Sequence, residues 1–219
     1  MTNSPHSFEI CGLCGESSRF ALKAYDRPFY FCDNCELIFV PRHLHLSPED
    51  QAARYGMHEN TMENAGYVAR FANLISQIKT HAPDVRRILD YGCGPGPVLV
   101  DLLRRAGYKA AGYDPYFASE TDLSSPFDAV VSTETIEHFS RPGEEIRRIC
   151  ALIRPGGFLF VMTEFHQGLN HFAKWHYPRD PTHVAFYGPR TLDCIARTFG
   201  LTLQFSDGRN TAGFRRTDG

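Results

Sequence analysis

The segment that most constrains this chain is RILDYGCGPG, residues 87–96. Its apolar beginning predicts a short buried strand, and the apolar spacing after it predicts a helix, so a glycine-rich turn joins the two. Gly92, Gly94 and Gly96 stand at alternate positions, and their lack of Cβ atoms lets a ligand approach the backbone closely. We therefore expect a ligand to bind against bare main chain at this turn.

The spacing of these glycines limits what the ligand is. A dinucleotide-binding turn requires G-x-G-x-x-G, whereas here the third glycine comes one residue early. No Gly-Lys-Ser/Thr follows, so a P-loop is excluded. The glycines alone leave open a turn that is tight for structural reasons only.

Three later segments continue the pattern. Residues 109–114 predict a second strand ending in Asp114, where an acid of a βαβ unit can accept hydrogen bonds from ribose hydroxyls. Residues 127–132 predict a third strand after a Ser-Ser-Pro turn. In residues 152–161 we expect a helix to stop at Pro-Gly-Gly and a strand to begin. Helices at 142–153 and from 189, then a closing antiparallel pair, complete the expected α/β order.

In this order and spacing the four segments resemble the class I S-adenosylmethionine-dependent methyltransferases, from about Arg86 to the end of the chain. The resemblance implies a Rossmann-like α/β sheet that holds the methionine end of the cofactor at Asp90, Gly92 and Gly94 and its ribose at Asp114. Only twelve residues separate Asp114 from Phe127, so the strand that the family places between these two positions, its third, is abbreviated here. Asp122 and Leu123 in this short connection are candidates for the adenine pocket. The full set of candidate cofactor residues is Asp90, Gly92, Cys93, Gly94, Asp114, Pro115, Thr133 and Tyr67.

A second motif precedes this region. Cys11-x2-Cys14 and Cys32-x2-Cys35 are separated by seventeen residues, which is the two-knuckle spacing of a structural zinc ribbon. Four thiolates fill the coordination shell of Zn²⁺, so this ion is expected to be structural. The remaining cysteines, Cys93, Cys150 and Cys194, are interpreted as small buried residues.

The charge of this predicted ribbon indicates whether it binds nucleic acid. Residues 1–50 carry four basic side chains against seven acidic ones, which argues against binding to phosphates. We therefore favour a scaffold or substrate-pocket role over nucleic-acid binding. The predicted organisation is a zinc-ribbon module at 1–45, a linker and helical lid at 46–84, and a methyltransferase domain at 85–219.

The middle segment contains two kinds of pattern. Apolar residues at 71, 74, 75 and 78 share one helical face, which predicts a helix packed on the sheet. Residues 55–60 are mixed and not periodic, and segments before the first strand often cover the cofactor in the resembling enzymes. Tyr55, His58 and Tyr67 are therefore candidate pocket residues.

Acidic and imidazole side chains follow the predicted third strand. Glu134, Glu137 and His138 share one face if residues 133–138 form a helical turn. Two carboxylates and an imidazole can hold a divalent ion, and a further ligand can come from the long loop at 164–189. That loop contains four histidines, His166, His171, His176 and His183.

Here a narrower resemblance applies. E-x-x-E-H with a later His is similar to the metal-binding pattern of the small-RNA 3′-terminal 2′-O-methyltransferases and of the ubiquinone-biosynthesis O-methyltransferases. It implies that Glu134, Glu137, His138 and His183 hold Mg²⁺ or another divalent ion. Glu-His at this place also occurs in class I methyltransferases without a metal, and then His138, His166 or His183 can act as the general base. The candidate catalytic residues are His138, His183, Glu137 and His166.

The long loop is also the candidate acceptor site, because it is dense in aromatic residues. Trp175, Tyr177, Phe186 and Tyr187 can either sandwich a planar acceptor or anchor the loop to the core. The sequence lacks a membrane-length apolar run and a secretory signal, so we expect a cytoplasmic protein. The oligomeric state stays open.

Taken together, these observations predict methyl transfer from S-adenosylmethionine to an oxygen of a small molecule, with or without a divalent ion. Three alternatives stay open. They are an RNA methyltransferase with a zinc module, a sugar C-methyltransferase of the kind that carries a four-cysteine zinc domain, and a non-catalytic binding scaffold.

Overall fold

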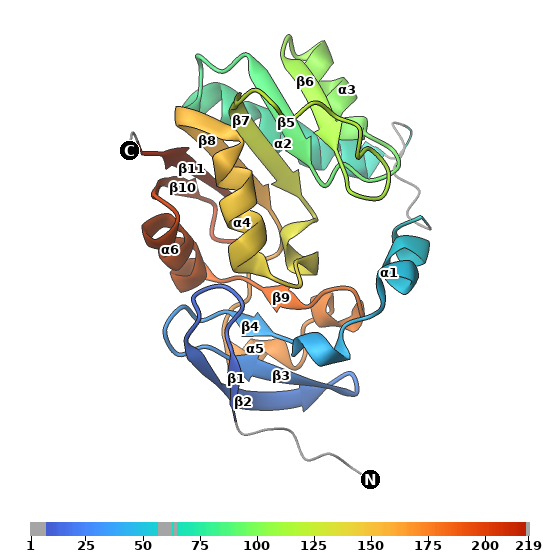
Figure 1. Ribbon diagram of the computed structural model, residues 1–219, viewed down its shortest axis with the longest axis vertical. Helices are drawn as coiled ribbons and strands as arrows, with labels where there is room; N and C mark the ends of the chain where they lie inside the picture. The colour runs from blue at the N-terminus through green and yellow to red at the C-terminus, as the bar shows by residue number, and fades with distance from the viewer. Residues whose placement is uncertain (1–7, 57–62, 64, 218–219) are drawn as a thin grey trace.

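The computed structural model describes residues 8–56, 63 and 65–217, and of Ala65 and Tyr67 it describes the backbone only. Two β-sheets lie one above the other along the long axis of the molecule (Figure 1). The larger has six strands in the order β10-β11-β8-β7-β5-β6, and the smaller has five in the order β1-β2-β3-β4-β9.

The larger sheet begins with the strand predicted before the glycine turn. Its bounds are β5 Arg87–Tyr91, β6 Lys109–Tyr113, β7 Phe127–Thr133, β8 Ile153–Met162, β10 Leu201–Ser206 and β11 Thr211–Arg216. The first four run parallel, and β11 is antiparallel to both β8 and β10. Within the described part of the chain β6 is an edge strand, and the connection after Asp114 is short, as expected. The Rossmann-like sheet is therefore confirmed.

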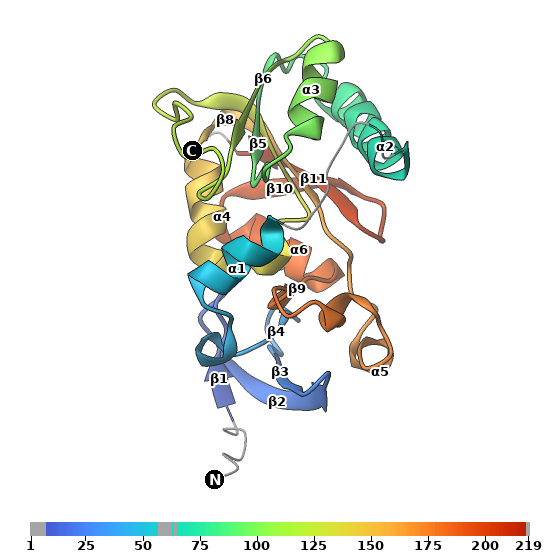
Figure 2. The ribbon, with the colours of Figure 1, turned by 90° about the vertical axis from the view of Figure 1, so that its right-hand side faces the viewer.

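Helices cover both faces of this sheet (Figure 2). Their bounds are α2 Ala65–His81, α3 Val98–Arg105, α4 Pro142–Ala151 and α6 Pro189–Thr198. The predicted apolar face of α2 is buried with α3 in one core cluster, and the apolar residues of α4 and α6 belong to another. Full burial of one such Leu, Ile or Phe side chain stabilises the fold by about 1.5–3 kcal/mol. The sheet is thus fixed between two apolar layers, and its carboxyl edge is left for the loops.

One boundary differs from the sequence prediction. Helix α4 ends at Ala151, before the Pro-Gly-Gly sequence, and that sequence lies inside β8. The cause is pairing with β7, because Phe127 lies opposite Ile153 and Arg154 forms an ion pair with Asp128 at 2.7 Å. A Cβ atom at Gly157 would lie 2.6 Å from the carbonyl oxygen of Asp128, so only glycine allows the two strands to approach here.

The smaller sheet is formed by the predicted ribbon together with one strand from the later part of the chain. Its bounds are β1 Phe8–Ile10, β2 Ser17–Ala24, β3 Arg27–Phe31, β4 Ile38–Phe39 and β9 Ala185–Phe186. In the pairing of β4 with β9, Ile38 lies opposite Phe186 and Phe39 opposite Ala185. The predicted boundary at residue 45 therefore divides the sequence but does not separate two independent sheets.

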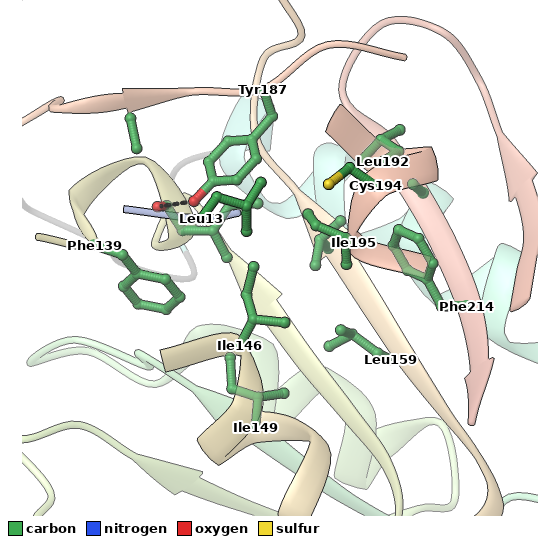
Figure 3. Close-up of a cluster of buried hydrophobic side chains, with 14 of the residues drawn as sticks. Leu13, Phe139, Ile146, Ile149, Leu159, Tyr187, Leu192, Cys194, Ile195 and Phe214 are labelled. Carbon is green, nitrogen blue, oxygen red and sulfur yellow. Dashed lines mark hydrogen bonds between the residues drawn. The ribbon is translucent and has the colours of Figure 1, made fainter. Parts of the chain in front are cut away.

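Side chains of the ribbon also enter the core of the larger part. Leu13, between the first two cysteines, belongs to the same buried cluster as Ile146 of α4 and Tyr187 (Figure 3). The N–H of Gly143 donates to the carbonyl of Gly12 at 2.9 Å, and a Cβ at Gly143 would lie 2.8 Å from the carbonyl oxygen of Leu13. The first knuckle and the start of α4 therefore pack backbone to backbone.

Short elements surround the carboxyl edge. They are η1 Arg42–Leu44, α1 Pro48–Tyr55, η2 Ile136–His138, α5 Leu169–Phe172 and η3 Tyr177–Arg179. The expected polar linker after Pro41 thus already contains helix, since Ser47 caps α1 by accepting from the N–H of Asp50 at 3.1 Å. Among the helices of the described residues, none combines the length and the apolar character needed to cross a membrane.

Candidate active site and metal centres

A cavity of about 690 Å³ opens at the carboxyl ends of β5, β6 and β7. This is where ligands bind in open α/β sheets. Its lining includes most of the predicted cofactor residues, namely Asp90, Gly92, Cys93, Gly94, Asp114, Pro115 and Thr133. It also includes Tyr55 and Tyr116, and the histidines His138 and His183. The structure therefore brings the cofactor candidates and two of the catalytic candidates to one cavity.

The two central glycines of the turn have different roles. Gly92 has φ +86°, and a Cβ there would lie 2.3 Å from the side chain of Thr135. Gly94 has φ +64°, but no heavy atom lies within 4 Å of the position a Cβ would take. Gly92 is thus required for packing beneath the turn, whereas Gly94 leaves free space against the cavity.

Two acidic side chains beside this turn differ in their hydrogen bonding. Asp114 is held in place, because its Oδ2 accepts from the N–H of Gly94 at 3.1 Å and its Oδ1 from the N–H of Tyr116 at 2.9 Å. Asp90 is 2% exposed, and its Oδ1 has no hydrogen-bond partner within the described residues. Burial, and next the charge of Asp114, raise the pKa of Asp90 to about 7. Asp90 is therefore a buried acceptor that lacks a donor.

These features fit S-adenosylmethionine. A cavity with bare glycine backbone accommodates a ligand lying along the turn, and the orphaned oxygen of Asp90 suits a cationic or N–H-bearing group. Tyr116, and not Asp122 or Leu123, lines the cavity beyond Asp114. The side chain of Tyr67 and all of His58 lie outside what the structure describes.

The second predicted group forms beside this cavity. Glu137, His138 and His183 bring one ligand atom each to within 4.8 Å of one another. Nδ1 of His138 donates to the carbonyl of Thr182 at 3.1 Å, and Nδ1 of His183 donates to the carbonyl of Tyr177 at 2.9 Å. These bonds leave both Nε2 atoms as acceptors, which is the arrangement found at metal-ligating histidines.

Glu137, the third member of this group, is completely buried. The hydroxyl of Tyr177 donates to its Oε1, while its Oε2 has no hydrogen-bond partner within the described residues. Burial raises the pKa of Glu137 to about 7. Burial lowers the pKa of His138 and, together with the neighbouring His138, that of His183 to about 3, so both rings are neutral near pH 7. A buried carboxylate oxygen without a donor and two neutral imidazoles form a donor set for a divalent ion.

Glu134 is placed differently from the prediction. It has φ +50°, and its N–H still donates to the carbonyl of Met162 at the end of β8, so helical geometry begins only at Ile136. Its carboxylate lies outside the group of three and stands 3.8 Å from Arg70. Glu134, Glu137 and His138 therefore do not share one helical face. The reason is that the chain remains attached to the sheet edge for one residue more than the spacing suggests.

His166 is placed away from the cavity, and the structure does not bring it together with the other candidate catalytic residues. It is 3% exposed, its Nε2 donates to the carbonyl of Glu36 at 2.9 Å, and its Nδ1 accepts from the N–H of Gly168 at 3.2 Å. Nε2 thus fastens the loop after β8 to the second CxxC turn, and Nδ1 is engaged within the loop itself.

The aromatic residues of the long loop are core residues rather than a substrate sandwich. Trp175, Tyr177 and Phe186 pack with Phe29 of β3 in a third buried cluster. Tyr187 is buried, and its hydroxyl donates to the carbonyl of Ile136 at 2.8 Å (Figure 3). Sequence reasoning missed the role of Tyr177 as the donor to Glu137, because a tyrosine in an aromatic loop carries no signal of that contact.

The four predicted zinc ligands lie together. The sulfur of Cys11 is 3.6 Å from that of Cys35, and the sulfur of Cys14 is 3.5 Å from that of Cys32. Zn–S bonds of about 2.3 Å in a tetrahedron place sulfurs roughly 3.8 Å apart, so the thiols are pre-arranged for such an ion. Each CxxC is followed by a residue in the left-handed region, Gly15 with φ +80° and Glu36 with φ +58°. The two knuckles thus repeat one backbone geometry.

The sheet order and the site at its carboxyl edge define a class I methyltransferase fold. The family model described as a methyltransferase domain matches residues 59–204, about two thirds of the chain. The chain therefore belongs to this family of methyltransferase domains, which confirms the class predicted from the glycine turn and Asp114.

Curated relatives match this chain over shorter stretches than the family model does. The ubiquinone biosynthesis O-methyltransferase of Caulobacter vibrioides is 32% identical, and the match covers 35% of this chain and 40% of the relative. The mitochondrial ubiquinone biosynthesis O-methyltransferase of Homo sapiens is 28% identical over 60% of this chain and 47% of its own. The chain thus spans less than half the length of these relatives.

Solved structures agree in fold. An O-methyltransferase family protein from Burkholderia thailandensis has a TM-score of 0.55 at 19% identity, covering 77% of this chain and 63% of its own. The N-methyltransferase NodS from Bradyrhizobium japonicum, solved with S-adenosyl-L-homocysteine, has a TM-score of 0.53 at 16% identity, covering 76% and 97%. At such identities these likenesses bear on the fold alone.

Proposed function

We propose that this protein transfers the methyl group of S-adenosylmethionine to an oxygen of a small acceptor, with a divalent ion held by Glu137, His138 and His183. The observation that carries the proposal is the grouping of Glu137, His138 and His183 within 4.8 Å of one another, with one Glu137 oxygen left without a donor, beside the cavity that the glycine turn and Asp114 line.

The chain's own residues divide the work of binding. Asp90 offers a buried acceptor to the cationic part of the cofactor, and Gly94 leaves space for it against the backbone. Asp114 is oriented by three backbone N–H groups and retains acceptor capacity for ribose hydroxyls. The cofactor supplies the methyl group as a sulfonium, so the protein must place an acceptor oxygen in line with it.

The divalent ion would supply the positive charge that lowers the pKa of an acceptor hydroxyl. The alternative is a histidine acting alone as base. His183 is a poor base at neutral pH, because burial and the adjacent His138 hold its pKa at about 3. The geometry therefore favours His138 and His183 as ligands.

The class of acceptor follows from the relatives and from one arginine. Relatives that match this chain are named O-methyltransferases. Arg70, Arg141 and Arg148 line the cavity and each form an ion pair with a glutamate, whereas Arg42 lines it without an acidic partner among the described residues. We therefore propose an acceptor that carries an anionic group besides its hydroxyl.

The ribbon is proposed to hold Zn²⁺ for structural reasons. Four thiolates leave no open position for an acceptor, and the ribbon packs against α4 and β9. Its acidic balance also supports a small-molecule acceptor over RNA.

The test is to incubate zinc-loaded protein with methyl-labelled S-adenosylmethionine and a bacterial extract, with Mg²⁺ added or withheld. The proposal predicts label in small metabolites that bind an anion exchanger, only with Mg²⁺, and none with Glu137→Gln. Label in RNA would support the RNA alternative instead. Absence of label and of cofactor binding would support the scaffold.

A further inference from the structure

Arg27, the first residue of β3, reaches from the ribbon to the loop that carries His183. One guanidinium nitrogen donates to the carbonyls of Pro181 and His183 at 3.0 and 3.1 Å. The other donates to the carbonyls of Pro178 and Asp180, the latter at 2.9 Å. A guanidinium offers several N–H donors in a rigid planar fork, so one side chain fixes four points of a short irregular segment.

The same segment holds both imidazoles of the proposed divalent-ion site. The carbonyl of Tyr177 accepts from Nδ1 of His183, and the carbonyl of Thr182 accepts from Nδ1 of His138. Six of the seven carbonyls in residues 177–183 therefore receive a side-chain donor, four from Arg27 and two from the histidines. Arg27 of the ribbon and the two histidines thus hydrogen-bond to the same short segment.

Two further contacts tie this segment to its surroundings. Tyr25, in the turn before Arg27, donates through its hydroxyl to the carbonyl of Trp175 at 2.8 Å. Asp180 accepts at 3.1 Å from Arg54 of α1 and at 2.9 Å from the N–H of Thr182. No carboxylate forms an ion pair with Arg27 among the residues that the structure describes. Its donors are committed to the carbonyls of this segment, which has no regular structure after η3, and such a backbone needs partners when it is partly buried.

We propose that Arg27 is the positioning residue of the divalent-ion site. The predicted zinc ribbon then supports that site by holding the segment on which its histidines depend. The proposal deepens the proposed function and rests on it. Arg27 orients the carbonyls of Tyr177 and Thr182, these carbonyls keep the protons of His138 and His183 on Nδ1, and both Nε2 atoms then face one point.

The first experiment reads the proton positions directly and needs no divalent ion. Protein labelled with ¹⁵N in histidine, loaded with zinc only, is compared by long-range ¹H–¹⁵N NMR as wild type, Arg27→Gln and Arg27→Lys. The wild type is expected to show His138 and His183 as single Nδ1–H tautomers. In Arg27→Gln both are expected to become tautomer mixtures, with partial recovery in Arg27→Lys. Unchanged tautomers in Arg27→Gln would overturn the proposal.

The second experiment measures Mn²⁺ affinity by electron paramagnetic resonance, together with zinc content and the affinity for S-adenosylhomocysteine. Loss of an outer-shell partner lowers metal affinity about 10–100-fold, and we expect that loss in Arg27→Gln with the zinc content and nucleoside affinity unchanged. Arg19→Gln is the matched control, because Arg19 also lies on the ribbon, where it forms an exposed ion pair with Asp33 and lies over the ring of Phe31 without contacting the loop of His183.

The outcomes separate this proposal from the proposed function. If the wild type binds no Mn²⁺, the metal-assisted mechanism fails, and the NMR comparison still decides the role of Arg27. If Arg27→Gln loses zinc and nucleoside binding together with Mn²⁺, Arg27 only stabilises the fold and the positioning role is wrong. Equal Mn²⁺ affinity in Arg27→Gln and Arg19→Gln would likewise overturn it.

Discussion

The hydroxyl of Tyr177 donates a hydrogen bond to Oε1 of Glu137, and both side chains are buried. The bond fixes the carboxylate so that Oε2 remains for another partner. The two residues lie forty positions apart, on η3 and η2. The loop after β8 therefore completes the site that begins after β7.

Tyr177→Phe tests this contact. Phenylalanine keeps the aromatic packing but removes the donor, so Glu137 loses the hydrogen bond that orients it. We expect about tenfold weaker Mn²⁺ binding and a loss of about 1–3 kcal/mol in the free energy of unfolding. Both are measurable by metal titration and urea denaturation. Unchanged Mn²⁺ affinity at unchanged fold would show that this hydrogen bond does not orient a metal-binding carboxylate.

Asp90 predicts a pH dependence of the ligand-free protein. Its pKa is raised to about 7, whereas an unfolded Asp titrates near 3.9. Between these values the folded state binds more protons than the unfolded state, so stability falls as pH rises from about 4 to 7. The share of Asp90 is on the order of 4 kcal/mol.

Urea unfolding of wild type and Asp90→Asn across this range checks the prediction. The free energy of unfolding of the variant is expected to fall less steeply with pH. The decline that remains is assigned to Glu134 and Glu137, whose pKa values burial also raises. Parallel curves for the two proteins would contradict the assignment of this proton to Asp90.

Gly92 and Gly94 should respond differently to alanine. Gly92→Ala combines left-handed strain with a Cβ only 2.3 Å from Thr135, so we expect at least about 2 kcal/mol of destabilisation. Gly94→Ala carries only the backbone strain of about 1–2 kcal/mol, but its methyl group enters the cavity and should weaken S-adenosylhomocysteine binding. Thermal melts and calorimetric titration separate the two effects. Equal destabilisation by both would refute the division of roles.

Cys35→Ser tests the structural part of the ribbon. Removal of one thiolate should release Zn²⁺, and because β4 pairs with β9, the disturbance should reach the segment before β9 that carries His183. We expect lower zinc content, a lower melting temperature and exchange-broadened His183 signals. Cys194→Ser, which changes a buried cysteine outside the cluster, is the control. A zinc-free Cys35→Ser with an unaltered His183 would contradict the link.

Local patterns in the sequence were sufficient for much of the fold and for the placement of most cofactor candidates around one cavity. The glycine turn, Asp114 and the CxxC pairs act through neighbours in the chain, so their spacing alone predicts where they lie. The abbreviated connection after Asp114 likewise agrees with the position of β6 at the edge of the sheet.

The parts that were missed depend on long-range contacts. Nothing in residues 185–186 indicates pairing with the ribbon, since two apolar residues fit any core. The four carbonyl contacts of Arg27 follow from loop geometry, and the left-handed backbone of Glu134 follows from its attachment to β8. His166 had the residue type of a base, but its burial against Glu36 is set by the packing of two distant segments.

The most direct test of the central claim is a Mn²⁺ titration of zinc-loaded protein in the presence of S-adenosylhomocysteine, on wild type, His183→Ala and Asp114→Ala. We predict one Mn²⁺ per wild-type chain. His183→Ala is expected to lose the ion but keep the nucleoside, and Asp114→Ala to lose the nucleoside but keep the ion. A wild type that binds the nucleoside but no ion beyond zinc would contradict the account.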